Sequence, residues 1–190
     1  MDKTLKIALL SLTFNVVFAI YYLVLAAVIC SWWLFILGIY YLVLSVVRFF
    51  VLRSKAEKYR IAKFTGWMLI MLSIALIGIV ILSVVRDRGH ELHMFVMIAM
   101  AAYAFTKVTL AIINLVKVRS SKPATLIALR NVSLADALVS IFALQRSMLV
   151  SFGGMAEEKI VIMNAIIGFV VCVIVFLLGI NLVKNKDNLF

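Results

Sequence analysis

Charged residues are scarce in this chain: they make up 14% of its 190 residues, whereas hydrophobic residues make up 66%. An ordinary soluble domain is about one-quarter charged and about half apolar. A chain of this length buries a limited fraction of its surface when it folds, so it could not hide this much apolar area from water. The composition therefore excludes a soluble enzyme and a disordered segment, and it predicts an integral membrane protein.

Cysteine, histidine and proline are also rare, with two, two and one residues. Cys30 and Cys172 lie in separate apolar segments, which excludes a disulfide scaffold and a cysteine metal site. His90 and His93 do not form a His-Glu-x-x-His motif, and we interpret them as members of a polar loop. Pro123 stands at the start of an apolar block, so the blocks lack the proline breaks that build many transporter sites.

Sequence motifs of enzyme chemistry are missing as well. The chain has no phosphate-binding glycine loop, no nucleophile elbow and no paired aspartates in its apolar blocks. We therefore expect that the protein is not an enzyme, and that it binds neither a metal nor another cofactor.

Apolar residues are concentrated in six blocks, and each block reaches the roughly 20 residues that a helix needs to cross a membrane. The run from Leu5 to Leu52 is too long for one crossing, so it must turn back near Cys30, where Trp32 and Trp33 indicate a membrane interface. The sequence thus predicts an all-α bundle that forms a single transmembrane domain over residues 1–190. Its predicted spans are residues 6–29, 33–52, 64–85, 93–116, 125–151 and 160–183.

Basic residues are distributed unequally between the two ends of these predicted spans. The end that carries both termini holds thirteen of the nineteen Lys and Arg residues, and the opposite end holds three. The thirteen are Lys3, Lys6, Arg48, Arg53, Lys55, Lys58, Arg60, Lys63, Lys117, Arg119, Lys122, Lys184 and Lys186. Under the positive-inside rule we expect both termini in the cytoplasm, with the protein in a bacterial cytoplasmic membrane.

The net charge of +11 would suggest nucleic acid as a partner of a soluble protein. Here the charges lie between apolar blocks, so anionic lipid headgroups are the expected partner and nucleic acid is not. The densest basic segment is residues 53–63, which we interpret as lying in the headgroup layer. Specific binding of an anionic lipid or of a cytoplasmic protein is the alternative for this segment.

Ionisable side chains also occur deep inside two of the predicted spans. Each costs about 3 kcal/mol at a helix centre on insertion scales, so such residues usually face protein or water. Lys107 and Asp136 each lie about 3 Å from the middle of their span at 1.5 Å per residue, at the same depth on helices joined by a short loop. The sequence therefore predicts an intramembrane pair of these two residues.

Further polar residues share helical faces with this pair, and together they form the candidate binding site. The candidates are Asn15, Tyr103, Lys107, Asn114, Arg130, Ser133, Asp136 and Ser140. Two other sets could contribute from the first two spans: Ser11 and Tyr22, and Tyr41, Ser45 and Arg48. Within the spans, Lys107, Arg130 and Arg146 outnumber Asp136, although Arg146 lies near the outer end and could reach the surface. This surplus of positive charge favours an anionic or amphipathic ligand.

Two functional hypotheses follow from these residues. The first is a small transporter, channel or binding protein for a polar, anionic or amphipathic solute, with the Lys107–Asp136 pair at its site. The alternative is a non-catalytic subunit or scaffold that assembles with itself or with a partner membrane protein. In that case the pair would fix only the helix register, and the small-residue face around Gly168 or the basic segment 53–63 would bind the partner.

Two stretches, residues 32–45 (WWLFILGIYYLVLS) with Arg48, and residues 134–153 (LADALVSIFALQRSMLVSFG), resemble small six-helix membrane proteins of Gram-positive bacteria. The resemblance covers most of the chain. It implies the same six-helix architecture, but no activity, because those proteins carry no assigned function.

Overall fold

The computed structural model describes residues 3–53, 58–85, 92–118, 124–151 and 156–184 of the chain. These ranges contain six long helices and no strand, which confirms the predicted all-α class. Each predicted span coincides with one helix to within six residues at either end. The helices are α1 (Lys3–Ile29), α2 (Trp32–Arg53), α3 (Lys58–Val85), α4 (Met94–Val118), α5 (Ala124–Ser151) and α6 (Glu157–Lys184).

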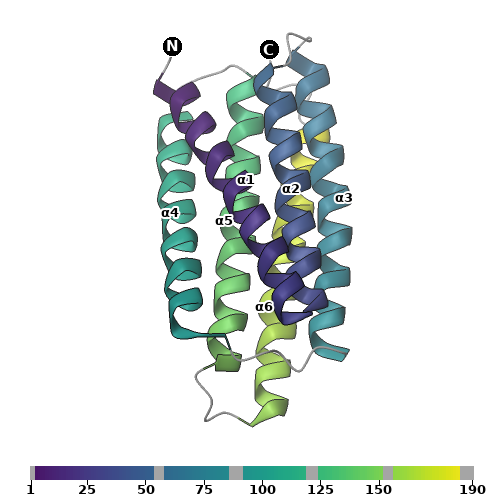
Figure 1. The fold of residues 1–190 in the computed structure, drawn as a ribbon. Coiled ribbons are helices and arrows are strands. Elements are labelled where there is room, and N and C mark those ends of the chain that lie inside the picture. The colour runs from purple at the N-terminus through teal and green to yellow at the C-terminus, as the bar shows by residue number, and fades with distance from the viewer. Residues whose placement is uncertain (1–2, 54–57, 86–91, 119–123, 152–155, 185–190) are drawn as a thin grey trace.

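The six helices run up and down, so both termini lie at the same end of the bundle (Figure 1). We call this the terminal end, and we call the other the loop end. The helix pairs with the most extensive contact are α3 with α6, α1 with α2, and α4 with α5. All six helices are long and apolar enough to cross a membrane.

Helix α5 lies at the centre of the bundle, where it contacts α2, α3, α4 and α6. It has the lowest mean hydropathy of the six candidate spans, 1.6, and the largest buried share, 67%. This combination is expected, because polar side chains in a membrane helix must face protein rather than lipid. Its polar stripe therefore points into the bundle.

The connection between α1 and α2 has a clear structural basis. Cys30 adopts a left-handed conformation with φ of 55°, and Ser31 N–H donates to the carbonyl oxygen of Ala26 at 3.2 Å. This is a Schellman arrangement, which ends a helix. The carbonyl oxygen of Ser31 then accepts a hydrogen bond from Phe35 N–H and begins α2. The turn occurs at the predicted position.

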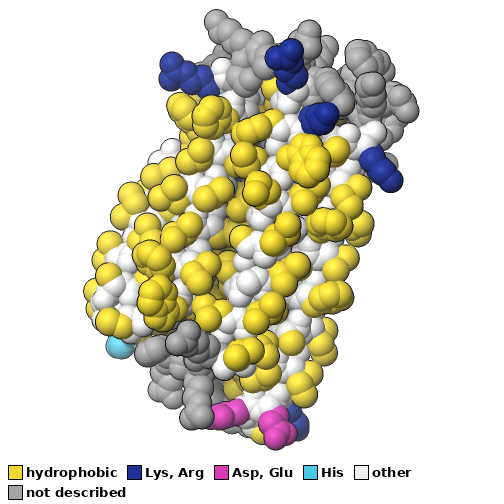
Figure 2. Space-filling model, turned by 90° about the vertical axis from the view of Figure 1, so that its right-hand side faces the viewer, with side chains coloured by type: hydrophobic (Ala, Val, Ile, Leu, Met, Phe, Trp, Pro, Cys, Tyr) yellow, Lys and Arg dark blue, Asp and Glu magenta, His cyan; other side chains and the backbone are white. Residues whose placement is uncertain are grey.

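The surface of the bundle is apolar along its length and charged at its ends. Figure 2 shows hydrophobic side chains over the middle, with basic side chains at the terminal end and Asp or Glu side chains at the loop end. Large hydrophobic residues such as Ile20, Ile74 and Phe169 are more than half exposed. A contiguous apolar belt of this kind is suited to contact with lipid.

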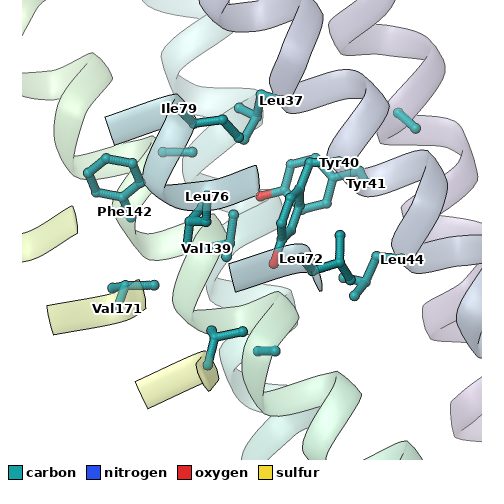
Figure 3. Packing of buried hydrophobic residues seen from close by; sticks show 14 of the residues in the cluster. Leu37, Tyr40, Tyr41, Leu44, Leu72, Leu76, Ile79, Val139, Phe142 and Val171 are labelled. Atoms are coloured by element: carbon teal, nitrogen blue, oxygen red, sulfur yellow. The ribbon is translucent and has the colours of Figure 1, made fainter. Parts of the chain in front are cut away.

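Two types of packing hold the interior together away from the charged residues. Aliphatic and aromatic side chains of α2, α3 and α5 interlock in the core, among them Leu37, Leu76 and Phe142 (Figure 3). Helices α3 and α6 instead approach closely at two glycines: a Cβ at Gly66 would lie 2.8 Å from the Gly179 carbonyl oxygen. Small residues allow this approach.

The small-residue face of α6 is occupied within the chain. A Cβ at Gly168 would lie 2.6 Å from Val80 of α3 and 3.1 Å from Phe142 of α5. The face was expected to be a possible surface for a partner. Instead it packs against α3 and α5, since its glycines permit close contact between these helices.

Candidate functional site

Three charged side chains meet inside the bundle, one each from α2, α4 and α5. Lys107 Nζ lies 2.6 Å from Asp136 Oδ2, and Arg48 Nη2 lies 3.3 Å from the same oxygen. Arg48 and Asp136 are fully buried, and Lys107 is 2% exposed. The predicted Lys107–Asp136 pair is confirmed, and Arg48 joins it. We call these three residues the charged cluster.

Serine and asparagine side chains from three helices surround the charged cluster. Arg48 donates to the hydroxyls of Ser11 and Ser133, the latter at 3.2 Å. Lys107 Nζ donates to the carbonyl and hydroxyl oxygens of Ser11 at 3.3 and 3.4 Å. Asn114 Nδ2 donates to the Ser133 hydroxyl at 3.1 Å. Both cations are therefore held by several acceptors.

The burial of Arg48 corrects its assignment to the basic segment that follows the second span. It lies six positions before Ser54 and five before the end of α2, which places it about 7.5 Å inside the helix. Its guanidinium points into the bundle because Asp136 and two serine hydroxyls satisfy it there. The terminal end thus keeps twelve of the nineteen basic residues, against three at the loop end.

Aromatic rings cover the charged cluster on the side that faces the loop end. Tyr103 lies one helical turn beyond Lys107, stacks on Phe18 with ring centroids 3.8 Å apart, and donates to Asn15 Oδ1 at 3.3 Å. Tyr41 stacks on Tyr22 at 5.5 Å and shares a 3.0 Å hydrogen bond with Ser140. These rings separate the cluster from that end of the bundle.

The polar bonds of the site connect two helical hairpins. Arg48 of α2 bonds to α5, Lys107 and Tyr103 of α4 bond to α1, and Tyr41 of α2 bonds to α5. Helices α1 and α4 otherwise make few contacts. We call this contact between the α1–α2 hairpin and the α4–α5 hairpin the polar seam. It is the place where the two hairpins could separate with the least loss of packing.

Among the predicted site residues, Arg130 is the one that makes no hydrogen bond to the charged cluster or to the side chains around it in the described part of the chain. It is partly exposed, and its Nε has no hydrogen-bond partner in the described part of the chain. Six residues separate it from Asp136, which places it about 9 Å away along α5 and about 120° around the helix. It was at the edge of the predicted polar stripe, and that offset turns it away from Asp136.

Three polar atoms of the site are buried without a hydrogen-bond partner. They are Asn15 Nδ2, Arg48 Nε and Asp136 Oδ1. A buried polar group left unsatisfied costs roughly 1–3 kcal/mol, so native proteins usually pair such groups with protein, water or a ligand. Two of the three atoms are donors and one is an acceptor. The site therefore retains binding capacity that its own residues do not use.

The charges of the cluster do not balance. Arg48 and Lys107 are two cations, whereas Asp136 is the one acidic residue between positions 92 and 156 of the sequence. With all three groups ionised, the cluster carries one net positive charge in a setting of low dielectric constant. A buried charge without a counterion is strongly unfavourable.

The described residues contain no group of three or more His, Cys, Asp or Glu side chains that could bind a metal ion. His93 is exposed and stacks on Phe95, with ring centroids 5.3 Å apart. His90 lies outside the described residues. The candidate site is thus a cluster of hydrogen-bonding and charged side chains.

Sequence reasoning underrated Arg48 and Ser11, which it named only as possible additions to the site. Arg48 lies in a helix that is apolar up to Val47 and again from Phe49 to Leu52. A single cation within such a run is the signal that could have identified it, because loop cations are usually flanked by other polar residues. Comparison of the chain with known protein families, curated proteins and solved structures finds no match.

Proposed function

We infer that this protein is a small membrane transporter or binding protein for a small anionic solute, and that the charged cluster is its binding site. The single observation that carries this proposal is the uncompensated positive charge of Arg48 and Lys107 beside Asp136. An anion bound there would neutralise the cluster, and it would do so without a metal or a cofactor.

The unpaired polar atoms support the same class of ligand. Arg48 Nε and Asn15 Nδ2 are donors: Arg48 belongs to the charged cluster, and Asn15 bonds to Tyr103 beside it. A carboxylate, phosphate or halide could accept from them. Asp136 Oδ1 is the remaining acceptor, so a solute with both an anionic group and a donor would satisfy all three atoms.

Access to the site requires a movement, because the cluster is enclosed. The polar seam is the natural place for it, since its bonds to α1 and α5 are individually weak. Hydrogen bonds between membrane helices contribute about 0.6 kcal/mol each on average. A solute that competes for Arg48 and Lys107 would replace these bonds and favour separation of the two hairpins.

The competing function is a membrane scaffold, in which the cluster only joins the hairpins. The observation that favours it is the enclosure of all three charges, with exposures of 0 to 2%. The net charge argues against it, because a purely structural pair would be more stable as one cation and one anion.

The location proposed for the protein is a bacterial cytoplasmic membrane with both termini inside. The excess of basic residues at the terminal end supports this orientation. Anionic headgroups would then contact the basic segment 53–63 on the cytoplasmic face. Residues 54–57 of that segment lie outside the described residues.

The proposal is tested by charge displacement in proteoliposomes adsorbed to a solid-supported membrane. Concentration jumps of chloride, inorganic phosphate, acetate and succinate are applied in turn to protein-containing and empty liposomes. We expect at least one anion to give a saturable signal that the Lys107→Gln variant reduces at least tenfold. The Gly78→Ala variant is the matched control, because a Cβ at this position meets no atom within 4 Å.

The result that would contradict the proposal is equally definite. If none of the four anions moves charge above the empty-liposome signal, the cluster does not bind small anions. An anion response that persists unchanged in folded Lys107→Gln protein would place the binding site elsewhere.

A further inference from the structure

A small pocket lies near the loop end of the bundle, away from the charged cluster. It is lined by Ser31 and the first residues of α2, by the end of α5, and by Leu92, two positions before the start of α4. Its lining residues are Ser31, Trp33, Leu34, Leu92, Arg146, Ser147 and Val150. One cation and two hydroxyl groups therefore border a single small pocket.

Arg146 is the cation of this pocket, and it is held back from the surface. Its guanidinium carbon lies 4.3 Å from the centre of the Trp33 ring, and the residue is 4% exposed. The sequence suggested that Arg146 could extend to the surface. Stacking on Trp33 keeps the guanidinium in the pocket instead, since an arginine over an indole face gains cation–π attraction.

Trp33 contributes a second, independent feature. It is 2% exposed, and its Nε1–H has no hydrogen-bond partner in the described residues. An indole N–H can only donate, and it is normally paired when it is buried. Trp33 lines the pocket, so an acceptor bound there could satisfy this N–H beside the Arg146 guanidinium.

The depth of the pocket in a membrane indicates where this acceptor comes from. Helix α5 has 28 residues and is about 42 Å long, which matches a bilayer with its headgroups. Arg146 lies five residues before its end at Ser151, or about 7.5 Å inside. This is close to the level at which the headgroups meet the hydrocarbon.

We propose that the pocket formed by Arg146, Trp33, Ser31 and Ser147 binds a phosphate group. The guanidinium and the indole N–H are the charged and neutral donors, and the Ser31 hydroxyl completes the set, whereas the Ser147 hydroxyl donates to the Ala143 carbonyl oxygen of its own helix. Arginine is well suited to phosphate because its planar donors match the phosphate oxygens. The phosphate could belong to a lipid headgroup or to a free phosphate ion, and the site does not depend on the charged cluster.

The test uses Trp33 fluorescence in the full chain carrying Trp32→Phe and Trp67→Phe, so that Trp33 is the one remaining tryptophan. The protein is titrated in maltoside detergent with inorganic phosphate and, separately, with dioctanoyl phosphatidic acid. We expect a saturable change in emission, with Arg146→Gln weakening the apparent affinity at least tenfold. The exposed Lys159 at the same end of the bundle provides the matched control, and Lys159→Gln should change the affinity less than twofold.

The two titrations separate the sources of the phosphate. A response to both probes supports a pocket for any phosphate group, and a response to the lipid alone supports a headgroup site. A response to inorganic phosphate alone supports a free-ion site. No saturable response to either probe overturns the proposal.

A second variant keeps the test decisive if Arg146→Gln does not fold. Trp33→Phe retains a ring beneath the guanidinium and removes only the Nε1–H donor. We expect it to weaken binding about three- to tenfold, measured by native mass spectrometry with the same two probes. Binding of the Trp33→Phe protein with wild-type affinity would also overturn the proposal.

Discussion

The polar seam and the α3–α6 contact join helices by opposite means. In the α3–α6 contact, Gly66 and Gly179 allow the two backbones to approach closely. In the polar seam, three ionised side chains and their hydrogen-bonding neighbours connect α1 and α2 to α4 and α5. The close approach at the two glycines is made by small uncharged residues, whereas the polar seam buries three charged side chains.

The glycine contact shows that α3 and α6 approach closely without a charged residue at the point of closest contact. Helix association in lipid has no hydrophobic driving force, and close packing of small residues replaces it. Each buried ionisable residue costs about 3 kcal/mol on insertion scales, and this cost offsets the stability that the bonds of the polar seam contribute. This contrast supports a role for the charged cluster in binding rather than in packing.

The largest expected loss of stability comes from removing the Asp136 carboxylate, which is the one negative charge of the charged cluster. In the Asp136→Asn variant, Arg48 and Lys107 remain as two buried like charges without a counterion. We expect the free energy of unfolding in mixed micelles to fall by about 3–5 kcal/mol. The control is Ser45→Ala, which removes a hydroxyl that donates to the Tyr41 carbonyl oxygen of its own helix. Equal stability of Asp136→Asn and Ser45→Ala would show that the cluster is not charged as described.

The glycine contact should respond to a single methyl group. A Cβ at Gly179 would lie 2.8 Å from Ile70 Cγ1 and 2.9 Å from the Gly66 carbonyl oxygen, and the backbone cannot easily yield. We expect Gly179→Ala to destabilise the protein by about 1–3 kcal/mol in the same unfolding assay. Gly78→Ala, which meets open space, should be neutral or slightly stabilising because alanine favours helix. Similar losses in both variants would contradict the close-contact description.

Removing one cation should affect stability less than removing the anion. In Lys107→Met, Arg48 still pairs with Asp136, so the remaining two charges balance. We expect a loss within about 1 kcal/mol, well below that of Asp136→Asn. Unfolding of the two variants side by side measures this asymmetry. A Lys107→Met loss as large as that of Asp136→Asn would mean that Arg48 does not compensate Asp136.

The smallest expected loss of stability comes from removing the Tyr103 hydroxyl beside the charged cluster. Tyr103→Phe removes the hydroxyl that donates to Asn15 but keeps the ring stacked on Phe18. We expect a loss of about 0.6 kcal/mol, typical of one hydrogen bond between membrane helices. A loss above about 2 kcal/mol would show that this hydroxyl is a main connection of the polar seam.

The fold was largely predictable from the sequence because span length and apolar composition are direct consequences of bilayer thickness. The Lys107–Asp136 pair was predictable for a related reason: depth along a helix can be counted at 1.5 Å per residue. Both quantities are properties of a single helix or of two helices joined by a short loop.

The remaining features depended on how distant helices pack, which residue counting does not reveal. Arg48 was expected among the cytoplasmic basic residues. Its contact with Asp136 was not predicted, because the distance between the two residues depends on how α2 lies against α5. The sequence likewise did not predict which surface packs against the glycine face of α6, since Gly168 could face another chain or α3. The phosphate pocket requires Trp33 and Arg146, which are 113 positions apart and meet only through the tertiary fold.

The most direct test of the central claim replaces all three charges at once, as Arg48→Met/Lys107→Met/Asp136→Leu. Buried ion pairs and triads can often be exchanged for apolar residues without loss of stability, so we expect this variant to unfold no more readily than the wild type. We also expect it to lose the anion-induced charge displacement in proteoliposomes. A folded triple variant with the wild-type anion response would contradict the account, because the charged cluster would then not be the binding site.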